Sequence, residues 1–279
     1  MKIILIPIDF SKESEKALSV GATIARRISA KLVLTHMVDL DERSLTKNPS
    51  DNFAQKLFQS KLAAKNFDEF LEKDFLDGIV VDTLLQNHID FKGISELANE
   101  LSADLIVMGS SGSKGLMEIT KGSNTEKVVR SSNVPVLVVK KNELKFSSET
   151  ILFVSDFNEE SIDAYNRISE FAQMLNAKMN CLYINLPGTA FKSTKEMDEI
   201  LFKFFTKAGH KSPLEGIKSV NRYADYSIEK GIYNFSNLST TDIIAIPTHG
   251  RKGLSHLLNG SISEDVANHS IIPVLTLRI

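Results

Sequence analysis

Short apolar runs alternate along the chain with longer segments in which apolar residues recur every three or four positions. The runs have the length of strands and lie at residues 3–8, 31–38, 79–85, 105–108 and 134–139. The intervening segments have helical periodicity and lie at residues 11–29, 53–75 and 93–101, while the polar segment 41–52 is predicted to be a loop. Apolar strands that alternate with helices are typical of parallel sheets buried on both faces. The pattern therefore predicts an open α/β sheet with right-handed crossovers and helices on both faces.

The same pattern begins again near residue 151. Three pairs of segments match in order along the chain, namely 4–11 with 151–158, 104–107 with 242–245, and 134–137 with 272–275. A period of this length indicates the duplication of a whole domain rather than a solenoid repeat. We predict two tandem domains, residues 1–141 and 150–279, joined by an exposed linker.

Composition narrows the class of protein. The net charge of −2 gives no electrostatic reason for broad binding to nucleic acid or to anionic membranes. No apolar run approaches the roughly 20 residues of a membrane span, and the first residues predict a strand rather than a signal peptide. Cys181 is the only cysteine, so no intrachain disulfide can form, and we expect a cytoplasmic location. Cys181 falls in an apolar predicted strand, residues 179–183, where it is expected to be a small core residue.

Small residues follow the apolar run at 105–108. Gly109 and Gly112 begin this segment, and Gly122 with Ser123 precedes a predicted helix. Glycines let backbone N–H groups approach an anion, and a helix N-terminus adds unpaired donors. The stretch therefore predicts a phosphate-binding loop, although the glycines could instead serve a tight strand-to-helix turn.

No catalytic constellation accompanies this loop. The P-loop pattern is absent, because Gly109 and Lys114 have the wrong spacing for it, and neither a nucleophile elbow nor a kinase motif set occurs. The six histidines show no tight spacing with cysteine or acidic residues that would predict a metal site. The sequence favours binding over dedicated catalysis.

These features resemble the universal stress protein family in its tandem-domain form, and the resemblance covers nearly the whole chain. Nucleotide-binding members carry the motif Gly-x2-Gly-x9-Gly-(Ser/Thr), which is satisfied here by Gly109, Gly112, Gly122 and Ser123. A strand-terminal aspartate such as Asp9 and a closing Val-Pro-Val-Leu-Val-Val strand are further family features. The resemblance implies an open five-stranded parallel sheet of the Rossmann-like, adenine nucleotide α-hydrolase-like type in each half. ATP would lie across the carboxyl ends of the strands.

The resemblance also implies roles for residues of the first half. The expected ATP contacts, from the base to the phosphates, are Asp9, Met37, Val38, Gly109, Gly112, Gly122, Ser123, Asn124 and Thr125. Asp9 is expected at the adenine or ribose, and a magnesium ion could accompany the phosphates. Asp9 could also be only a cap of the following helix, and Ser123 could cap its own helix while it contacts phosphate.

The second half departs from the motif. Pro247 replaces the first glycine, and proline fixes φ, removes a backbone donor and adds bulk where the backbone would approach a ligand. Pro187 and Gly188 also follow the second strand of this half closely, whereas Arg251 and Lys252 could still attract phosphate. We expect weaker nucleotide binding, or none. The counterparts of the first-half site are Asp156, Gly250, Gly260 and Ser261.

The leading functional hypothesis is an ATP-binding stress-response sensor or regulatory module that uses mainly its N-terminal domain. One alternative is an interaction scaffold that binds no nucleotide, and a weaker one is a slow ATPase. Family dimers pair their closing strands, so the resemblance implies that residues 136–139 and 274–277 pair within one chain, and a homodimer of tandem chains could form in addition. The phenylalanine-rich segment 191–205 is expected to pack a helix, with a partner groove as the alternative.

Overall fold

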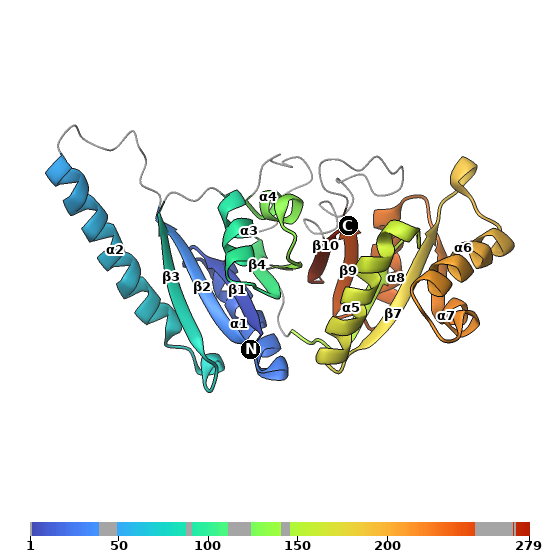
Figure 1. Cartoon of the computed structure of the whole chain (residues 1–279), viewed down its shortest axis with the longest axis horizontal. Helices are drawn as coiled ribbons and strands as arrows, with labels where there is room; N and C mark the ends of the chain where they lie inside the picture. The colour runs from blue at the N-terminus through green and yellow to red at the C-terminus, as the bar shows by residue number, and fades with distance from the viewer. Residues whose placement is uncertain are drawn as a thin grey trace. The chain divides into compact units, whose positions relative to one another are not determined.

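The computed structural model describes residues 2–38, 49–87, 91–110, 124–140, 146–248, 270 and 272–279. The chain forms two compact units, and Figure 1 shows that each contains a sheet with helices against it. The first unit holds strands β1 to β5, and the second holds β6 to β10. Each unit has the α/β architecture that the alternation of apolar runs predicts.

The first unit alternates strands with helices. In chain order its elements are β1 (Ile3–Ile8), α1 (Lys12–Ile28), β2 (Lys31–Val38), α2 (Pro49–Leu71), the 3-10 turn η1 (Asp74–Leu76), β3 (Val81–Asn87), α3 (Phe91–Glu100), β4 (Leu105–Ser110), α4 (Asn124–Ser131) and β5 (Val136–Lys140). The described strand pairs are parallel, in the order β3-β2-β1-β4-β5. Right-handed crossovers in this order place α1 and α2 on one face and α3 and α4 on the other. Figure 1 shows α3 and α4 side by side.

Helix α1 begins and ends where its sequence dictates. The Ser11 hydroxyl caps the first turn by accepting a hydrogen bond from the backbone N–H of Ser14 at 3.2 Å. The buried face of the helix packs against β1, β4 and β5. At the other end, Ser29 has a φ of 52° and its N–H donates to the Ala25 carbonyl, which is a left-handed helix cap. The helix predicted over residues 11–29 is confirmed.

Helix α2 differs from the prediction at both ends. We predicted a loop over 41–52 and a helix over 53–75, whereas the helix runs Pro49–Leu71 and a 3-10 turn follows at Asp74–Leu76. Proline suits the first turn of a helix, because its missing N–H would have no partner there and its fixed φ is helical. The loop prediction was therefore wrong for residues 49–52.

The second unit repeats this arrangement. Its elements are β6 (Thr150–Val154), η2 (Glu159–Ser161), α5 (Ile162–Met174), β7 (Lys178–Asn185), η3 (Gly188–Ala190), α6 (Thr194–Lys207), α7 (Pro213–Ser219), β8 (Val220–Ala224), α8 (Ile228–Leu238), β9 (Ile243–Thr248) and β10 (Val274–Arg278). Its strands pair in parallel in the order β8-β7-β6-β9-β10. None of the described helices in either unit is long and apolar enough to cross a membrane.

An aromatic cluster fills the core of the second unit. Phe204 and Phe205 on α6 contact the rings of Phe157 and Tyr165, with centroids 5.1 to 6.2 Å apart. The interpretation of segment 191–205 as helix packing is confirmed for these two phenylalanines, which are buried. Cys181 lies buried in β7, as expected for a small core residue.

Candidate functional site

In the first sheet, the direction in which successive strands are added reverses between β1 and β4. Strand β1 leads outward to β2 and β3, whereas β4 leads to β5 on the other side. The two strands pair in parallel through Ile4 with Leu105 and Leu5 with Ile106. At such a switch point the loops diverge and leave a crevice at the carboxyl ends of the strands, where open α/β folds bind ligands. Asp9 after β1 and Gly109 in β4 lie at this edge.

A sharp backbone bend follows the first strand of each half. Phe10 has a φ of 60° and Phe157 a φ of 56°, both in the left-handed region. That region costs an L-residue roughly 1–3 kcal/mol and is used mainly by glycine and asparagine. The ring of Phe10 lies 4.6 Å from the His36 ring, and Phe157 is buried in the aromatic core. The bend turns the chain directly after Asp9 and Asp156, so that both aspartates stand at the strand ends.

Asp9 is exposed and is held by the residue that caps α1. Its Oδ1 accepts hydrogen bonds from the backbone N–H of Ser11 at 3.0 Å and from the Ser11 hydroxyl at 2.5 Å. Partial burial opposes ionisation, but the hydrogen bonds from Ser11 and Ser14 outweigh it and lower the pKa of Asp9 below its ordinary value of 3.8. Asp9 is therefore ionised at neutral pH, and the helix-capping role belongs to Ser11 rather than to Asp9.

Gly109 lies against the first turn of α1. A Cβ atom placed on Gly109 would overlap the carbonyl group of Glu13 and come within 3.0 Å of the backbone nitrogen of Ser14. These are backbone atoms of a packed helix, so no change of rotamer could make room. The sequence interpretation attributed this glycine to a close approach of ligand. The structure adds a packing requirement that exists without any ligand and that sequence reasoning missed.

Polar contacts fasten the end of β4 to its neighbours. The buried Thr125 hydroxyl, in the first turn of α4, donates to the Gly109 carbonyl at 3.3 Å. Lys140 pairs in register with Ser110, and its Nζ donates to the Ser110 hydroxyl at 3.2 Å. Burial lowers the pKa of Lys140 to about 8. Thr125 thus ties α4 to β4, and Lys140, which the sequence prediction did not include, brings an amine to this strand end.

The end of β2 lies beside Asp9. His36 pairs in register with Ile8, and the Nδ1 atom of His36 lies 2.9 Å from the Ile8 carbonyl oxygen. The carbonyl can only accept, so Nδ1 carries the hydrogen of this bond. Met37 and Val38 complete the strand, and Met37 is half-buried. The structure therefore brings the expected base-contacting positions to the same edge as Asp9.

Much of the predicted phosphate loop lies outside the described residues. These positions are Gly112, Gly122 and Ser123 in the first half and Gly250, Gly260 and Ser261 in the second. Asn124 is the first residue of α4. Across the part of the chain that the structure describes, no group of three or more histidines, cysteines and acidic residues is placed to hold a metal ion.

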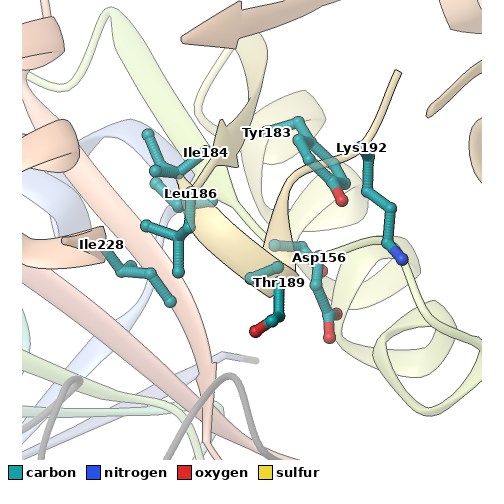
Figure 2. Close-up of a pocket in the computed structure, with 10 residues that line it drawn as sticks. Asp156, Tyr183, Ile184, Leu186, Thr189, Lys192 and Ile228 are labelled. Carbon is teal, nitrogen blue, oxygen red and sulfur yellow. The ribbon is translucent and has the colours of Figure 1, made fainter. Parts of the chain in front are cut away.

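The second half has a cavity of about 370 Å³ at the carboxyl ends of β6 and β7. Figure 2 shows the apolar side chains of Ile184, Leu186 and Ile228 on one side and the polar ends of Asp156 and Thr189 on the other. Asp156 was predicted here as the weaker counterpart of Asp9. The wall that carries Thr189 follows Pro187 and Gly188, a pair that the sequence interpretation noted without inferring a pocket.

Pro247 lies buried inside β9, where it pairs in register with Leu277. The helix that follows β6 also starts differently from its first-half counterpart. Asn158 caps a 3-10 turn, Glu159–Ser161, before α5 begins, whereas α1 starts directly after Ser11. A 3-10 turn is narrower than an α-helical turn. In the second half, where Pro247 replaces the first motif glycine, the turn that corresponds to the Glu13 turn of α1 is thus the narrower 3-10 turn Glu159–Ser161.

The topology and the residues at the strand ends define a doubly wound α/β protein with candidate binding positions at the carboxyl edge of its sheets. A model of the universal stress protein family matches residues 1–140 and again residues 148–278. The chain therefore belongs to the universal stress protein family, and it carries the family domain twice. The tandem form predicted from the sequence is confirmed.

Individual relatives agree with this placement. Universal stress protein MJ0577 of Methanocaldococcus jannaschii is 34% identical over 156 residues, which cover 50% of this chain and 95% of that protein. The crystal structure of a universal stress protein from Archaeoglobus fulgidus DSM 4304 is similar with a TM-score of 0.73 at 17% identity, covering 99% of this chain and 98% of that chain. A putative universal stress protein from Pseudomonas aeruginosa UCBPP-PA14 gives a TM-score of 0.60 at 16% identity, covering 100% and 93%. At these identities the two structures show a shared fold.

Proposed function

We propose that the chain binds ATP in its first half and acts as a stress-response sensor or regulatory module. The observation that carries the proposal is the complete glycine motif that starts at Gly109, on a strand that pairs with the strand before Asp9. The second half, in which Pro247 replaces the first glycine, binds ATP weakly or not at all.

The first-half residues suit the parts of ATP. The ionised Asp9 accepts hydrogen bonds, and both the ribose hydroxyls and the exocyclic amine of adenine can donate them. Met37 offers a polarizable surface to a flat base. The start of α4, after Ser123, offers backbone N–H groups to the phosphates, whose oxygens could also hold a magnesium ion.

The same residues favour binding over hydrolysis. A carboxylate whose pKa is lowered, as that of Asp9 is, is a weak general base at neutral pH. ATP that remains bound stabilises, by mass action, the conformation to which it binds. The resulting change in the populations of the conformations is how a binding module reports nucleotide levels.

We also propose that β5 and β10, the last strands of their sheets, pair with each other within one chain. Each is apolar, and an apolar edge strand left unpaired is prone to association. Light scattering on the purified full chain, with a charged substitution at Leu137 in β5 as comparison, tests this pairing. A larger hydrodynamic radius in the variant supports it, and an unchanged radius and stability argue against it.

Isothermal titration of the full chain with ATP and magnesium tests the nucleotide proposal. The chain with Asp9→Ala should bind ATP at least tenfold more weakly than the parent. The matched change in the other half, Asp156→Ala, should leave ATP affinity within about twofold. No heat at ~0.5 mM ATP, a level that would miss only millimolar affinity, would overturn the proposal and leave the scaffold hypothesis in its place.

A further inference from the structure

We propose that a groove between α6 and α7 binds an amphipathic helix of a partner protein, one whose apolar stripe is flanked by acidic side chains. The groove has a volume of about 660 Å³. Helices α6 and α7 form it together with Arg222, in the middle of β8, and Figure 1 shows the two helices side by side. Among the described residues, none that lines this groove also lines the cavity beside Asp156. The two surfaces are therefore distinct, and this one is independent of ATP binding in the first half.

Helix α6 has two faces of different character. The side chains that it buries in the core of the second unit are those of Met197, Leu201, Phe204 and Phe205. The residues of α6 that line the groove are Lys195, Asp198, Glu199, Phe202 and Lys203. Their spacing of three and four positions puts them on one side of the helix. Such a face is normally polar, yet Phe202 is 46% exposed on it. Packing in the core does not account for this phenylalanine.

Helix α7 supplies the opposite wall of the groove. Leu214 is 63% exposed, and Ile217 lies three positions further along the same side of the helix. The buried Gly216 faces the core instead, where an added Cβ atom would come within 2.7 Å of the Phe205 ring. This glycine lets α7 pack closely on α6, so that Leu214 and Ile217 meet Phe202 in one apolar patch. An exposed apolar patch with a polar rim is typical of an interaction site.

An ion pair closes the base of the groove. The guanidinium of Arg222 on β8 donates to the carboxylate of Asp198 on α6 at 2.5 Å. This bond joins the strand to the helix, and the Gly216 contact joins the two helices to each other. The walls are therefore held in place before a partner arrives, which reduces the entropic cost of binding.

The rim of the groove carries an excess of positive charge. Lys195, Lys203 and Lys218 are exposed and make no ion pair with any residue that the structure describes. Residues 192–222 include seven basic and four acidic residues, whereas the whole chain has a net charge of −2. The groove thus differs in sign from the chain as a whole, and acidic groups on a partner would complement it.

The spread of these charges favours a helix over a small amphipathic anion. Lys195 and Lys203 are eight residues apart, which is about 12 Å along α6, and Lys218 stands on the other wall. A fatty acid has one carboxylate and could meet only one of these amines. An amphipathic helix can repeat acidic side chains on both sides of an apolar stripe, and a groove between two helices is a common seat for such a helix.

Fluorescence anisotropy with a designed probe tests the proposal on the full chain. The probe is a labelled peptide of about 15 residues, close to the length of α6, and is stapled so that it is helical before it binds. It carries leucines at positions i, i+3, i+4 and i+7 with glutamates on both sides. A second probe has lysines in place of the glutamates. The acidic probe should bind saturably and about tenfold or more tightly than the basic one.

Substitutions of exposed apolar residues locate the binding surface. Phe202→Ser and Leu214→Ser should each weaken binding of the acidic probe by about fivefold or more. The matched control is Leu238→Ser, at the end of α8, where the parent side chain is 77% exposed. This control should leave the affinity within about twofold. Circular dichroism of each variant establishes that the chain is folded.

Charge reversal tests the electrostatic part. The double variant Lys203→Glu, Lys218→Glu should prefer the basic probe, whereas Lys230→Glu, at an exposed position of α8, should keep the preference for the acidic one. Absence of saturable binding of either probe up to about 200 μM, or equal affinity for both, would overturn the proposal. Tighter binding of dodecanoate than of the acidic probe would assign the groove to a fatty acid instead. A change in sedimentation caused by Phe202→Ser without any probe would assign it to a second copy of the chain.

Discussion

The α-carbon of Gly109, near the end of β4, lies against the carbonyl group of Glu13 in the first turn of α1. The residue that begins the glycine motif is therefore also a point of close contact between a central strand and the helix that follows Asp9. A substitution at Gly109 changes both functions at once, so loss of ligand binding in such a variant would not identify a ligand contact.

Gly109→Ala should destabilise the protein even without nucleotide. The added methyl group meets backbone atoms that cannot rotate away, and overpacking of this kind costs about 1–3 kcal/mol. Urea unfolding followed by circular dichroism measures the change. Glu100→Ala, at an exposed position of α3, is the control and should change stability by less than about 0.5 kcal/mol. An unchanged midpoint in Gly109→Ala would show that α1 can shift to accept a side chain.

Asp9 should give the protein a pH-dependent contribution to stability. Its pKa is lower in the folded chain than the ordinary value of 3.8, so its contribution is fully present above that value. The contribution is lost as the pH falls through the lower folded pKa. The difference in unfolding free energy between the parent and Asp9→Asn should therefore shrink as the pH is lowered from about 6 to about 3. A difference that stays constant over this range would contradict the hydrogen-bonded arrangement with Ser11.

Changes at Asn185 should act in a graded way. Asn185→Asp keeps an acceptor for the Lys192 N–H but loses the donor to its carbonyl, whereas Asn185→Val loses both. Each hydrogen bond is worth about 0.5–1.5 kcal/mol. Hydrogen exchange of the segment around Lys192 should accelerate moderately in the aspartate variant and more in the valine variant. Equal protection in all three chains would mean that other contacts hold this loop.

Cys181 should be inert while the chain is folded. Burial in β7 raises the pKa of its thiol to about 12, and the thiolate is the reactive species. An aromatic disulfide reagent at pH 8 should react with less than about a tenth of the protein in minutes, and fully once the chain is unfolded in urea. Rapid labelling of the native chain would show that β7 opens readily.

The fold could be predicted because its signals are local. Apolar runs of strand length such as residues 3–8 and 105–108 are typical of strands in a sheet that is covered on both faces, and the internal duplication shows the same pattern a second time. The start of α2 was missed because Pro49 was interpreted as a loop residue, although a first helical turn accepts proline.

The candidate site was only partly predictable for a different reason. Asp9 and the glycine motif carry a recognisable spacing, whereas the packing of Gly109 on Glu13 depends on two segments far apart in the chain. The cavity beside Asp156 likewise depends on a side chain, Asn185, that closes a loop through backbone contacts. No spacing rule encodes such contacts, and they became visible only in three dimensions.

The positive φ angles of Phe10 and Phe157 have one more consequence. Phe10 and Phe157 hold an unfavourable backbone conformation, and their rings are packed among other aromatic side chains that help to keep it. The orientation of the neighbouring Asp9 and Asp156 side chains therefore depends on that aromatic packing as well as on the strands. In a thermal melt, the near-ultraviolet signal of the aromatic rings and the capacity to bind ligand should therefore disappear in the same transition.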